Sequence, residues 1–576
     1  MNPSQKIIED MFNKGFLVNQ DLLKDANQTL LDKIECEEDL LVLNEDYVNV
    51  LVQQTSLVDW YDLDQYRVDV EKKRDDDLYQ AHLQNFKENN PSFNSSLGVQ
   101  KQQISNLKVE ISKTLENSFN TTLSVPSESL TSEDSSSSLS LASEPLIALA
   151  SPLDNLCSPQ RVEIVISYQN IPHKYEVSDF TTLFLSRYRF LENLLRHRSE
   201  CQNVLTIGRL LSKKEKETVT VIGLVEEINE TQKGNLALTV EDPTGRIKIF
   251  FSKENPELFH QAKDLVFDEV IGISGKLGDK IIFAENIIWP DLPVNQLKKS
   301  DQEEYIIFLS DVHLGSNLFL KEEFNKFLSW IKGKVGNEQQ REIAHKVKYI
   351  VIAGDLVDGV GIYPTQAEEL EINEISAQYE QFCNLIKEIP LDKQIIICPG
   401  NHDAVHLAEP QSSFDKTFAP GLFKLPNVTL VTNPAIVNVG KSASFSGFNV
   451  LLYHGYSFDY YVANVESIRN NGGYHRADLI MKFLLKRRHL APSFKSTPYF
   501  PAHKEDPLLV KIIPDFFVSG HIHYSNISNY KGITLVCGSC WQGKTSFQEK
   551  LGHEPEPARV PIVNLKTREI KVLKFI

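Results

Sequence analysis

Short apolar runs alternate with polar, glycine-containing loops through the last half of the chain, from Tyr305 onward. The runs are Tyr305–Leu309, Tyr349–Ala353, Gln394–Cys398, Val450–Tyr453 and Phe516–Ser519. An apolar run of this length between loops indicates a strand that is buried on both faces. Because the carboxyl ends of parallel strands meet at one edge of an open α/β sheet, we expect the loop side chains to gather there.

A second pattern, of short alternating runs separated by turn residues, occupies residues 218–288. The runs are Thr218–Ile228, Leu236–Val240, Arg246–Phe251, Val270–Ser274 and Lys280–Ile288. Five strands in about 75 residues favour a small OB-type barrel. Before it, Ser178 is the expected N-cap of an amphipathic helix that runs to about Leu195. OB barrels bind single strands or dock proteins, and without an obvious ladder of aromatics for base stacking we favour docking.

The N-terminal arm has another composition. Residues 1–70 contain apolar-periodic segments and predict a small helical module. Residues 71–155 are rich in Asp, Asn, Gln and Ser, so they predict a disordered linker. The expected organisation is therefore 1–70 helical module, 71–155 linker, 156–300 helix plus OB barrel, and 301–576 the domain with the polar loops.

The net charge of −17 lies almost entirely in this arm. Residues 1–160 hold 12 Lys and Arg against 27 Asp and Glu, which leaves 48 against 50 in the remainder. The remainder can therefore still contact nucleic acid. The run Lys486-Arg487-Arg488 is either a phosphate-binding cluster or a solvated helix face.

Nothing in the composition indicates secretion or membrane insertion. No apolar run approaches the ~18 residues of a membrane helix, and residues 1–10 lack the features of a signal peptide. Seven scattered cysteines favour reduced thiols. The lone pair Cys537 and Cys540 has no second pair to complete a zinc site, so we interpret the spacing as chance. We expect a cytoplasmic protein.

The loops after the apolar runs carry metal-type ligands: Ser310-Asp311-Val312-His313, Gly354-Asp355 with Asp358, Asn401-His402, His454 and His521-Ile522-His523. Hydrolysis of a phosphodiester needs an activated water and compensation for charge on the phosphoryl oxygens, and two cations roughly 3.5–4 Å apart supply both. A carboxylate can bridge the cations, imidazoles and an amide complete their ligand sets, and a nearby acid protonates the leaving oxygen. This set of loops predicts a two-metal phosphoesterase.

These motifs resemble the calcineurin-like metallophosphoesterase superfamily, and more specifically the small subunit of archaeal family D DNA polymerase. The segments that carry the second resemblance are Gly354–Pro364, Leu485–Pro492, Pro514–His523, Trp541-Gln542 and Val560–Lys566. The resemblance covers residues 160–576. It implies a two-sheet αββα sandwich preceded by an OB-fold barrel.

The resemblance also implies roles for residues. One metal ion takes Asp311, His313 and His523, the other takes Asn401, His454 and His521, and Asp355 bridges both. His402 is the general acid, held by Asp358 through a hydrogen bond that favours its protonated form. The implied activity is a 3′→5′ exonuclease that removes misincorporated nucleotides. Its metal ions are typically manganese, with magnesium, iron(II) or zinc as alternatives.

The implied partners are DNA 3′ ends and the large catalytic polymerase subunit, with a sliding clamp beyond it. Two other functions stay open: a non-catalytic scaffold subunit of the polymerase, and a free-standing metallophosphoesterase. The presence of all seven ligand positions and of His402 argues against the scaffold.

Two short motifs have alternative interpretations. Gly538–Thr545 satisfies the P-loop pattern, but too little chain follows for an NTPase core, so we do not expect ATP binding. Gln5–Phe12 loosely fits a clamp-binding peptide, but the same spacing occurs in any amphipathic helix, and we favour helix packing.

Overall fold

The computed structural model describes residues 17–18, 42–43, 162–168, 174–201, 203–210, 217–501, 503–550 and 553–576. The chain divides into two units, residues 1–149 and 150–576. In the first unit, strands β1 (Leu17–Val18) and β2 (Val42–Leu43) pair in parallel, so these residues are extended where the pattern predicts helix. The rest of the predicted helical module, the linker 71–155 and the clamp-like segment lie outside the described residues.

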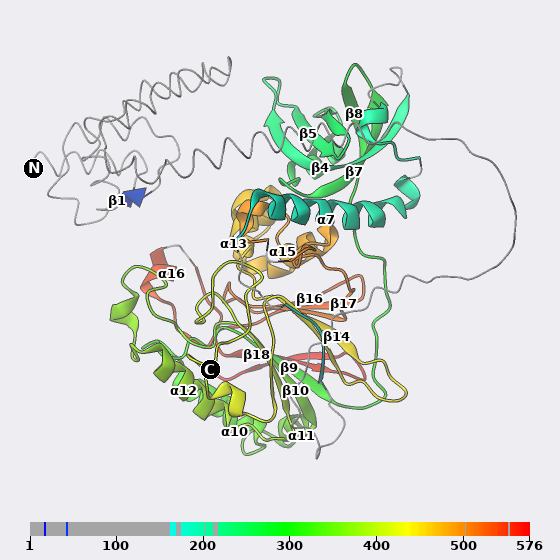
Figure 1. Ribbon diagram of the computed structural model, residues 1–576. Coiled ribbons are helices and arrows are strands. Elements are labelled where there is room, and N and C mark those ends of the chain that lie inside the picture. The colour runs from blue at the N-terminus through cyan, green and yellow to red at the C-terminus, as the bar shows by residue number, and fades with distance from the viewer. Residues whose placement is uncertain are drawn as a thin grey trace, which may run out of the picture. The chain divides into compact units, whose positions relative to one another are not determined.

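The second unit begins its regular structure with the predicted barrel, which is closed and five-stranded (Figure 1). Its strands are β4 (Thr218–Glu230), β5 (Leu236–Asp242), β6 (Gly245–Phe251), β7 (Val270–Leu277) and β8 (Ile281–Ile288), in the order β4-β5-β6-β8-β7. Helix α9 (Pro256–Lys263) connects β6 to β7. Side chains such as Val221, Leu238 and Ile249 fill the barrel interior. The predicted OB-type barrel is confirmed.

Helix α7 (Val177–Arg196) packs on β4 and β7, and Figure 1 shows it running along the barrel. The helix matches the predicted one, but its N-cap is Glu176 and not Ser178. The Glu176 N–H donates to Asp179 Oδ2 at 2.8 Å. Because this acidic pair already satisfies the first turn, the helix starts earlier than the serine predicts.

Two six-stranded sheets form the C-terminal part of this unit. The first consists, in order across the sheet, of β12 (Val428–Leu430), β11 (Gln394–Cys398), β10 (Val347–Ala353), β9 (Tyr305–Leu309), β18 (Arg559–Asn564) and β19 (Ile570–Lys574). The second consists of β16 (Asn526–Tyr530), β17 (Ile533–Cys537), β15 (Phe516–Ser519), β14 (Phe448–Leu452), β13 (Ala435–Val439) and β3 (Val162–Ser167). Strands β9 to β12 are parallel, as the alternation of apolar runs and loops predicts.

Strand β3 departs from the expected domain boundary. It falls within the 156–300 segment assigned to the helix and barrel, yet it pairs antiparallel with β13, with Val162 opposite Val439. The chain therefore contributes an edge strand to the second sheet before it forms the barrel.

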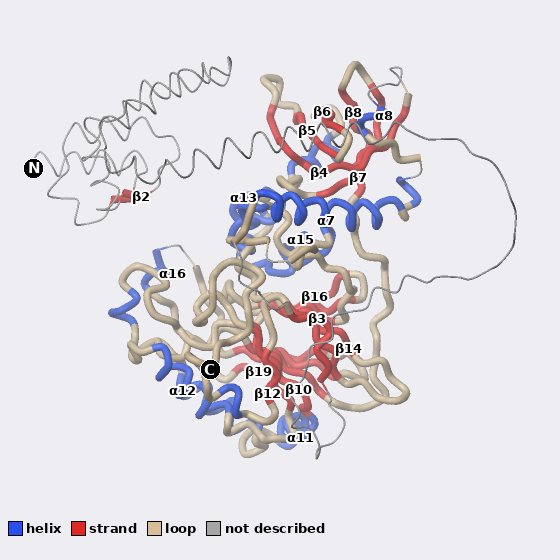
Figure 2. Tube along the Cα trace, in the orientation of Figure 1, coloured by secondary structure: helices blue, strands red, loops and turns tan. Residues whose placement is uncertain are grey.

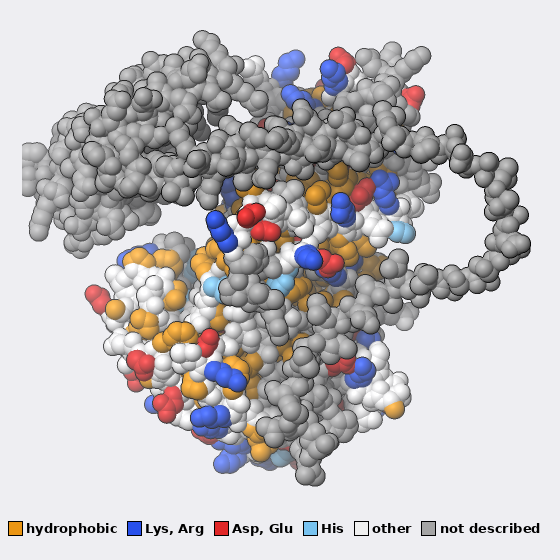
Figure 3. Space-filling view, in the orientation of Figure 1, with side chains coloured by type: hydrophobic (Ala, Val, Ile, Leu, Met, Phe, Trp, Pro, Cys, Tyr) orange, Lys and Arg blue, Asp and Glu red, His pale blue; other side chains and the backbone are white. Residues whose placement is uncertain are grey.

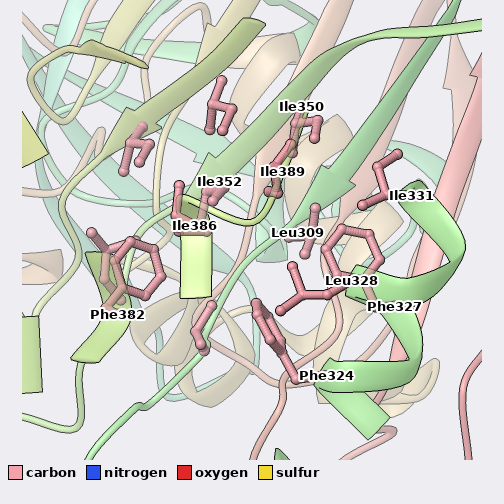
Figure 4. Close-up of a cluster of buried hydrophobic side chains, with 14 of the residues drawn as sticks. Leu309, Phe324, Phe327, Leu328, Ile331, Ile350, Ile352, Phe382, Ile386 and Ile389 are labelled. Carbon is pink, nitrogen blue, oxygen red and sulfur yellow. The ribbon is translucent and has the colours of Figure 1, made fainter. Parts of the chain in front are cut away.

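The strands are buried on both faces because alternate side chains point into different cores. In β9, Ile306 and Phe308 lie in the core between the two sheets, whereas Ile307 and Leu309 lie in the core under the helices. Figure 4 shows Leu309 in that second core, together with phenylalanines of the covering helices. The continuous apolar runs thus combine two half-buried faces that meet different layers.

Helices cover the outer face of each sheet, giving a helix, sheet, sheet, helix order of layers, and Figure 2 shows α11 and α12 beside the strands of the first sheet. The first sheet is covered by α10 (Lys321–Ile331), α11 (Glu338–Lys346) and α12 (Ile375–Ile386). The second is covered by α13 (Phe458–Asn464), α14 (Glu466–Asn470) and α15 (Ala477–Arg487). The short helices are α8 (Ile207–Leu210), α16 (Ser546–Lys550) and the 3-10 turns Ser199–Cys201, Gln366–Glu369, Leu422–Lys424, Gly473–Arg476 and Phe494–Ser496.

The basic run at the end of α15 joins the barrel to the sandwich. Arg487 is buried and lies 2.9 Å from the buried carboxylate of Glu269, measured from Nε to Oε2. Arg488 is also buried and donates to the main-chain oxygen of Val510, while the Lys486 ammonium lies over the Trp289 ring. Neither interpretation of this run is correct: it is not a phosphate-binding surface or a solvated helix face, because its charges are satisfied inside the protein.

Arg487→Ala is expected to destabilise the fold by about 3–5 kcal/mol, because it leaves the Glu269 carboxylate buried without its partner. The measurement is chemical unfolding, compared with Lys263→Ala. Lys263 makes an exposed pair with Glu466 across the same two parts of the chain, at 3.1 Å, and its loss should cost less than about 1 kcal/mol. Equal stability losses in the two variants would contradict the internal role of Arg487.

Candidate functional site

The loops that follow the strands hold the candidate residues in an unusual backbone conformation. Five of these residues, Asp311, His313, Asp355, His521 and His523, have φ between 50° and 72°. Residues other than glycine seldom occupy this left-handed region, and such strain persists where the surroundings enforce it, commonly at functional sites. The strands β9, β10 and β15 thus deliver these side chains in fixed, locally strained turns.

The first group of candidate ligands is Asp311, His313 and His523, whose ligand atoms all lie within 4.8 Å of one another. The two Nε2 atoms of the histidines are 2.9 Å apart, and His523 Nε2 is 3.5 Å from Asp311 Oδ1. All three side chains are buried. Burial opposes ionisation of Asp311, but the neighbouring His523 outweighs it and keeps the pKa of that carboxyl below its usual value.

The second group is Asn401, His454 and His521. The Asn401 Oδ1 atom lies 3.0 Å from His454 Nε2 and 3.0 Å from His521 Nδ1, so the amide oxygen faces both rings. These residues follow three different strands, β11, β14 and β15. The structure thus gathers side chains that are up to 120 residues apart in the chain.

Asp355 lies between the two groups. Its Oδ2 atom is 3.2 Å from His454 Nε2 and 3.8 Å from His313 Nε2. Burial raises its pKa, but His454 and the other histidines nearby lower it more, so the pKa is well below its usual range. A Cβ on Gly400 would lie 2.2 Å from Asp355 Oδ1, so only glycine allows this close approach.

His402 and Asp358 meet differently from the arrangement that the resemblance implies. The His402 Nδ1 atom lies 2.8 Å from the main-chain oxygen of Asp358 and not from its carboxylate. The carboxylate instead lies 3.1 Å from His313 Nδ1. Burial lowers the pKa of His402, which favours the neutral ring and not the protonated one that we expected. Asp358 therefore orients His313 with its side chain and His402 only with its backbone.

Several residues that contact the site were not found from the sequence. Asp459 Oδ2 lies 3.0 Å from His521 Nε2, and Gln548 Nε2 lies 2.8 Å from His523 Nδ1. Gln366 donates to Asp358 Oδ2 and Gln542 to Asp358 Oδ1, both at 2.8 Å. Gln542 was visible only as half of the Trp-Gln pair in the resemblance, and the other three have no motif that marks them.

Asp403 is a further buried carboxyl beside the site. It accepts hydrogen bonds from the Gly400 N–H at 2.8 Å and from the Tyr379 hydroxyl at 3.0 Å. Burial, reinforced by the charge of Asp355, raises its pKa to about 7. Through the Gly400 amide, Asp403 fixes the loop that carries Asn401 and His402.

A cavity of about 790 Å³ opens beside these residues. His313, Asp355, Asn401, His402 and His523 line it. It is large enough to receive a nucleotide-sized group. The structure thus joins an accessible cavity to a cluster of carboxylate, imidazole and amide ligands.

The P-loop-like segment belongs to this site and does not form a nucleotide-binding loop. Lys544 pairs with Glu554 at 2.6 Å, and the Trp541 N–H donates to the main-chain oxygen of Asp311 at 2.9 Å. The helix that follows, α16, has five residues. The lysine that a P-loop would place on phosphates is therefore engaged in an ion pair.

Among the described residues, no helix is long and apolar enough to cross a membrane. Comparison with known proteins gives two family matches. Residues 306–526 match a family described as the B-type subunit of DNA polymerases alpha and epsilon. Residues 219–281 match an OB-fold nucleic acid binding domain. The second match coincides with the observed barrel.

Individual relatives are the DNA polymerase II small subunits of three archaea. The chain is 36% identical to that of Methanothermobacter thermautotrophicus over 400 residues, which is 69% of this chain and 80% of the relative. It is 38% identical to that of Archaeoglobus fulgidus over 67% of this chain and 75% of the relative. It is 38% identical to that of Pyrococcus furiosus over 69% of this chain, but spans only 64% of that relative's length. The chain therefore belongs to the DNA polymerase II small subunits, the small subunits of archaeal family D DNA polymerase.

Proposed function

We propose that this chain is a two-metal 3′→5′ exonuclease that proofreads for the polymerase of which it is a subunit, with a C-terminal domain of the calcineurin-like metallophosphoesterase fold. The observation that carries the proposal is the position of Asp355 between two groups of three candidate ligands. The layered order of helix, sheet, sheet and helix supports the assignment of the fold.

The residues present fit two divalent cations. Asp311, His313 and His523 would hold one, Asn401, His454 and His521 the other, and Asp355 both. A set of carboxylates, imidazoles and an amide suits Mn²⁺ in particular, with Mg²⁺, Fe²⁺ or Zn²⁺ as alternatives. When bound, the cations supply an activated water and neutralise charge on the phosphoryl oxygens.

The side chains around the cations orient the ligands. The main-chain oxygen of Ala353 lies 2.8 Å from His454 Nδ1, so it accepts the proton there and leaves Nε2 as the ligand atom. Asp358 acts in the same way on His313. Gln548 and Asp459 contact the ring nitrogens of His523 and His521.

His402 is positioned to protonate the leaving group. A carbonyl oxygen only accepts hydrogen bonds, so the contact with the Asp358 oxygen places a hydrogen on His402 Nδ1 and leaves Nε2 for the substrate. In hydrolysis of the terminal phosphodiester, water oxygen bonds to phosphorus, the bond from phosphorus to the 3′-oxygen breaks, and that oxygen takes a proton from Nε2. The negative charge of a bound phosphodiester favours the protonated ring, against the effect of burial.

Retention of every ligand position supports catalysis over the scaffold function. Membership of a family of polymerase subunits supports DNA 3′ ends as substrate and a large catalytic subunit as partner, and argues against a free-standing phosphoesterase. A sliding clamp remains a prediction from the resemblance.

The test uses single-stranded oligonucleotides labelled at the 5′ end or at the 3′ end, incubated with the purified chain and Mn²⁺. A 3′→5′ exonuclease gives a ladder of shortening products from the 5′ label and free mononucleotide from the 3′ label. A chelator should stop both reactions. Absence of cleavage by the chain, repeated after addition of the large subunit, would favour the scaffold function.

Asp358→Ala is expected to weaken metal binding by about 10–100-fold, because His313 loses the partner that fixes its ring. The measurement is Mn²⁺ titration by calorimetry, with Asp301→Ala as an exposed-carboxylate control. If Asp358 acted chiefly on His402, metal affinity would be unchanged and only the pH profile of cleavage would move.

A further inference from the structure

The cavity beside the candidate ligands contains chemistry that the proposed hydrolysis does not use. Four of its lining residues, Tyr363, Tyr456, Tyr474 and Phe547, are aromatic, and none of the described residues that line it is Lys or Arg. On the face shown in Figure 3, basic and acidic side chains are interspersed, and the described residues form no broad basic patch there. A DNA strand that enters the cavity therefore finds few cationic side chains to hold its phosphates.

Two of these rings form a rigid pair. Tyr363 and Phe547 are stacked, with centroids 5.4 Å apart and planes at 25°. The Tyr363 hydroxyl donates to Glu369 Oε2 at 2.8 Å, and the Ser546 N–H donates to Glu369 Oε1 at 3.1 Å. One carboxylate thus connects the segments that carry both rings. Although it is stacked on Tyr363, Phe547 is 40% exposed and keeps a free surface.

The pair lies next to the candidate catalytic residues. The Tyr363 ring is 6.4 Å from the ring of His402. Gln548, which follows Phe547 in α16, contacts His523 Nδ1 at 2.8 Å. The platform therefore adjoins both the proposed acid and one of the proposed metal ligands.

We propose that Tyr363 and Phe547 form a stacking platform for the nucleobase at the 3′ end of the strand; this inference rests on the proposed exonuclease function. Every base has a π-face, so stacking accepts whichever nucleotide occupies the end. A terminal base must leave its pair before it can stack on the platform. The platform thus selects single-stranded and mismatched ends over paired ends.

The test compares two single-stranded substrates that differ only in their 3′-terminal nucleotide, one with a base and one abasic. Wild type should cleave the abasic end with a kcat/KM about tenfold lower, mainly through KM, because one stacking contact is lost. Phe547→Ala should lose about tenfold on the base-bearing end, so that the preference between the two ends disappears. Phe547→Trp should restore the preference.

Two controls separate stacking from structure. Phe418 is also 40% exposed but does not line the cavity, and Phe418→Ala should keep both the rate and the preference of wild type. Tyr363→Phe removes the hydroxyl and keeps the ring, so it should keep the preference for a base. If Phe547→Ala slows both substrates equally, or slows neither, the platform proposal is wrong. If wild type cleaves neither substrate, even with the large subunit present, the exonuclease proposal fails, and the platform proposal fails with it.

Discussion

Replacing Asp355 by alanine is expected to reduce metal-dependent DNA cleavage below detection and to leave both metal positions empty. Asp355 is the carboxylate that faces both groups of candidate ligands, through His313 on one side and His454 on the other. Without it, two divalent cations would share the single remaining carboxylate ligand, Asp311, and their mutual repulsion would be poorly compensated. Metal content of the Mn²⁺-loaded, desalted variant and cleavage of a single-stranded oligonucleotide are the two measurements.

A matched control is Asp392→Ala. The Asp392 side chain is 53% exposed and pairs with Lys348 at 2.9 Å, so its loss should change neither metal content nor cleavage. Thermal unfolding of Asp355→Ala and wild type, both without metal, checks that the variant is folded. A folded Asp355→Ala chain that still binds two Mn²⁺ per molecule would contradict the bridging role.

His402→Ala is expected to lower kcat by about 10²–10⁴-fold, the usual contribution of a general acid, while metal content stays unchanged. The ring contacts the Asp358 carbonyl through Nδ1, and its main-chain N–H donates to Asp355 Oδ1 at 2.8 Å. Alanine keeps the second contact, so the loop should hold its position. The measurement is single-turnover cleavage of DNA at saturating Mn²⁺.

Leaving-group chemistry provides the sharper version of this test. A p-nitrophenyl nucleotide ester releases an anion that needs no proton, so His402→Ala should lose much less activity on it than on DNA. His406→Ala changes an exposed histidine of the same loop and should behave as wild type on both substrates. An equal loss on the two substrates would show that His402 acts by binding and not as the acid.

The sequence predicts the candidate site well because its ligands follow strands that are buried on both faces. Continuous apolar runs such as Tyr305–Leu309 mark these strands without any knowledge of their neighbours, and parallel order brings their carboxyl ends together. The ligand types then limit the chemistry. For these positions, local pattern and tertiary structure agree.

Contacts between distant segments are what the sequence does not reveal. Gln548 and Asp459 reach the site through single side-chain contacts, and no spacing rule relates them to His523 or His521. For Asp358 the motif identifies the residue but not the atom: its carbonyl contacts His402, while its carboxylate contacts His313. A one-dimensional pattern cannot separate these two roles.

Burial of charge is equally invisible locally. Arg487 and Arg488 look like a surface cluster until Glu269, 218 residues earlier in the chain, is placed beside Arg487. Strand β3 has a similar explanation: it is an edge strand whose partner, β13, lies more than 250 residues further along. Both features depend on pairing that only the complete fold establishes.

The central claim is that two metal ions at this site drive DNA cleavage. Its most direct test is a titration of the metal-depleted chain, assembled with the large subunit, in which bound Mn²⁺ and shortening of a 3′-mismatched DNA are recorded together. The account predicts that two Mn²⁺ bind to this subunit and that cleavage appears only as the second is bound. Full occupancy of both positions without cleavage, or cleavage that persists without metal, would contradict it.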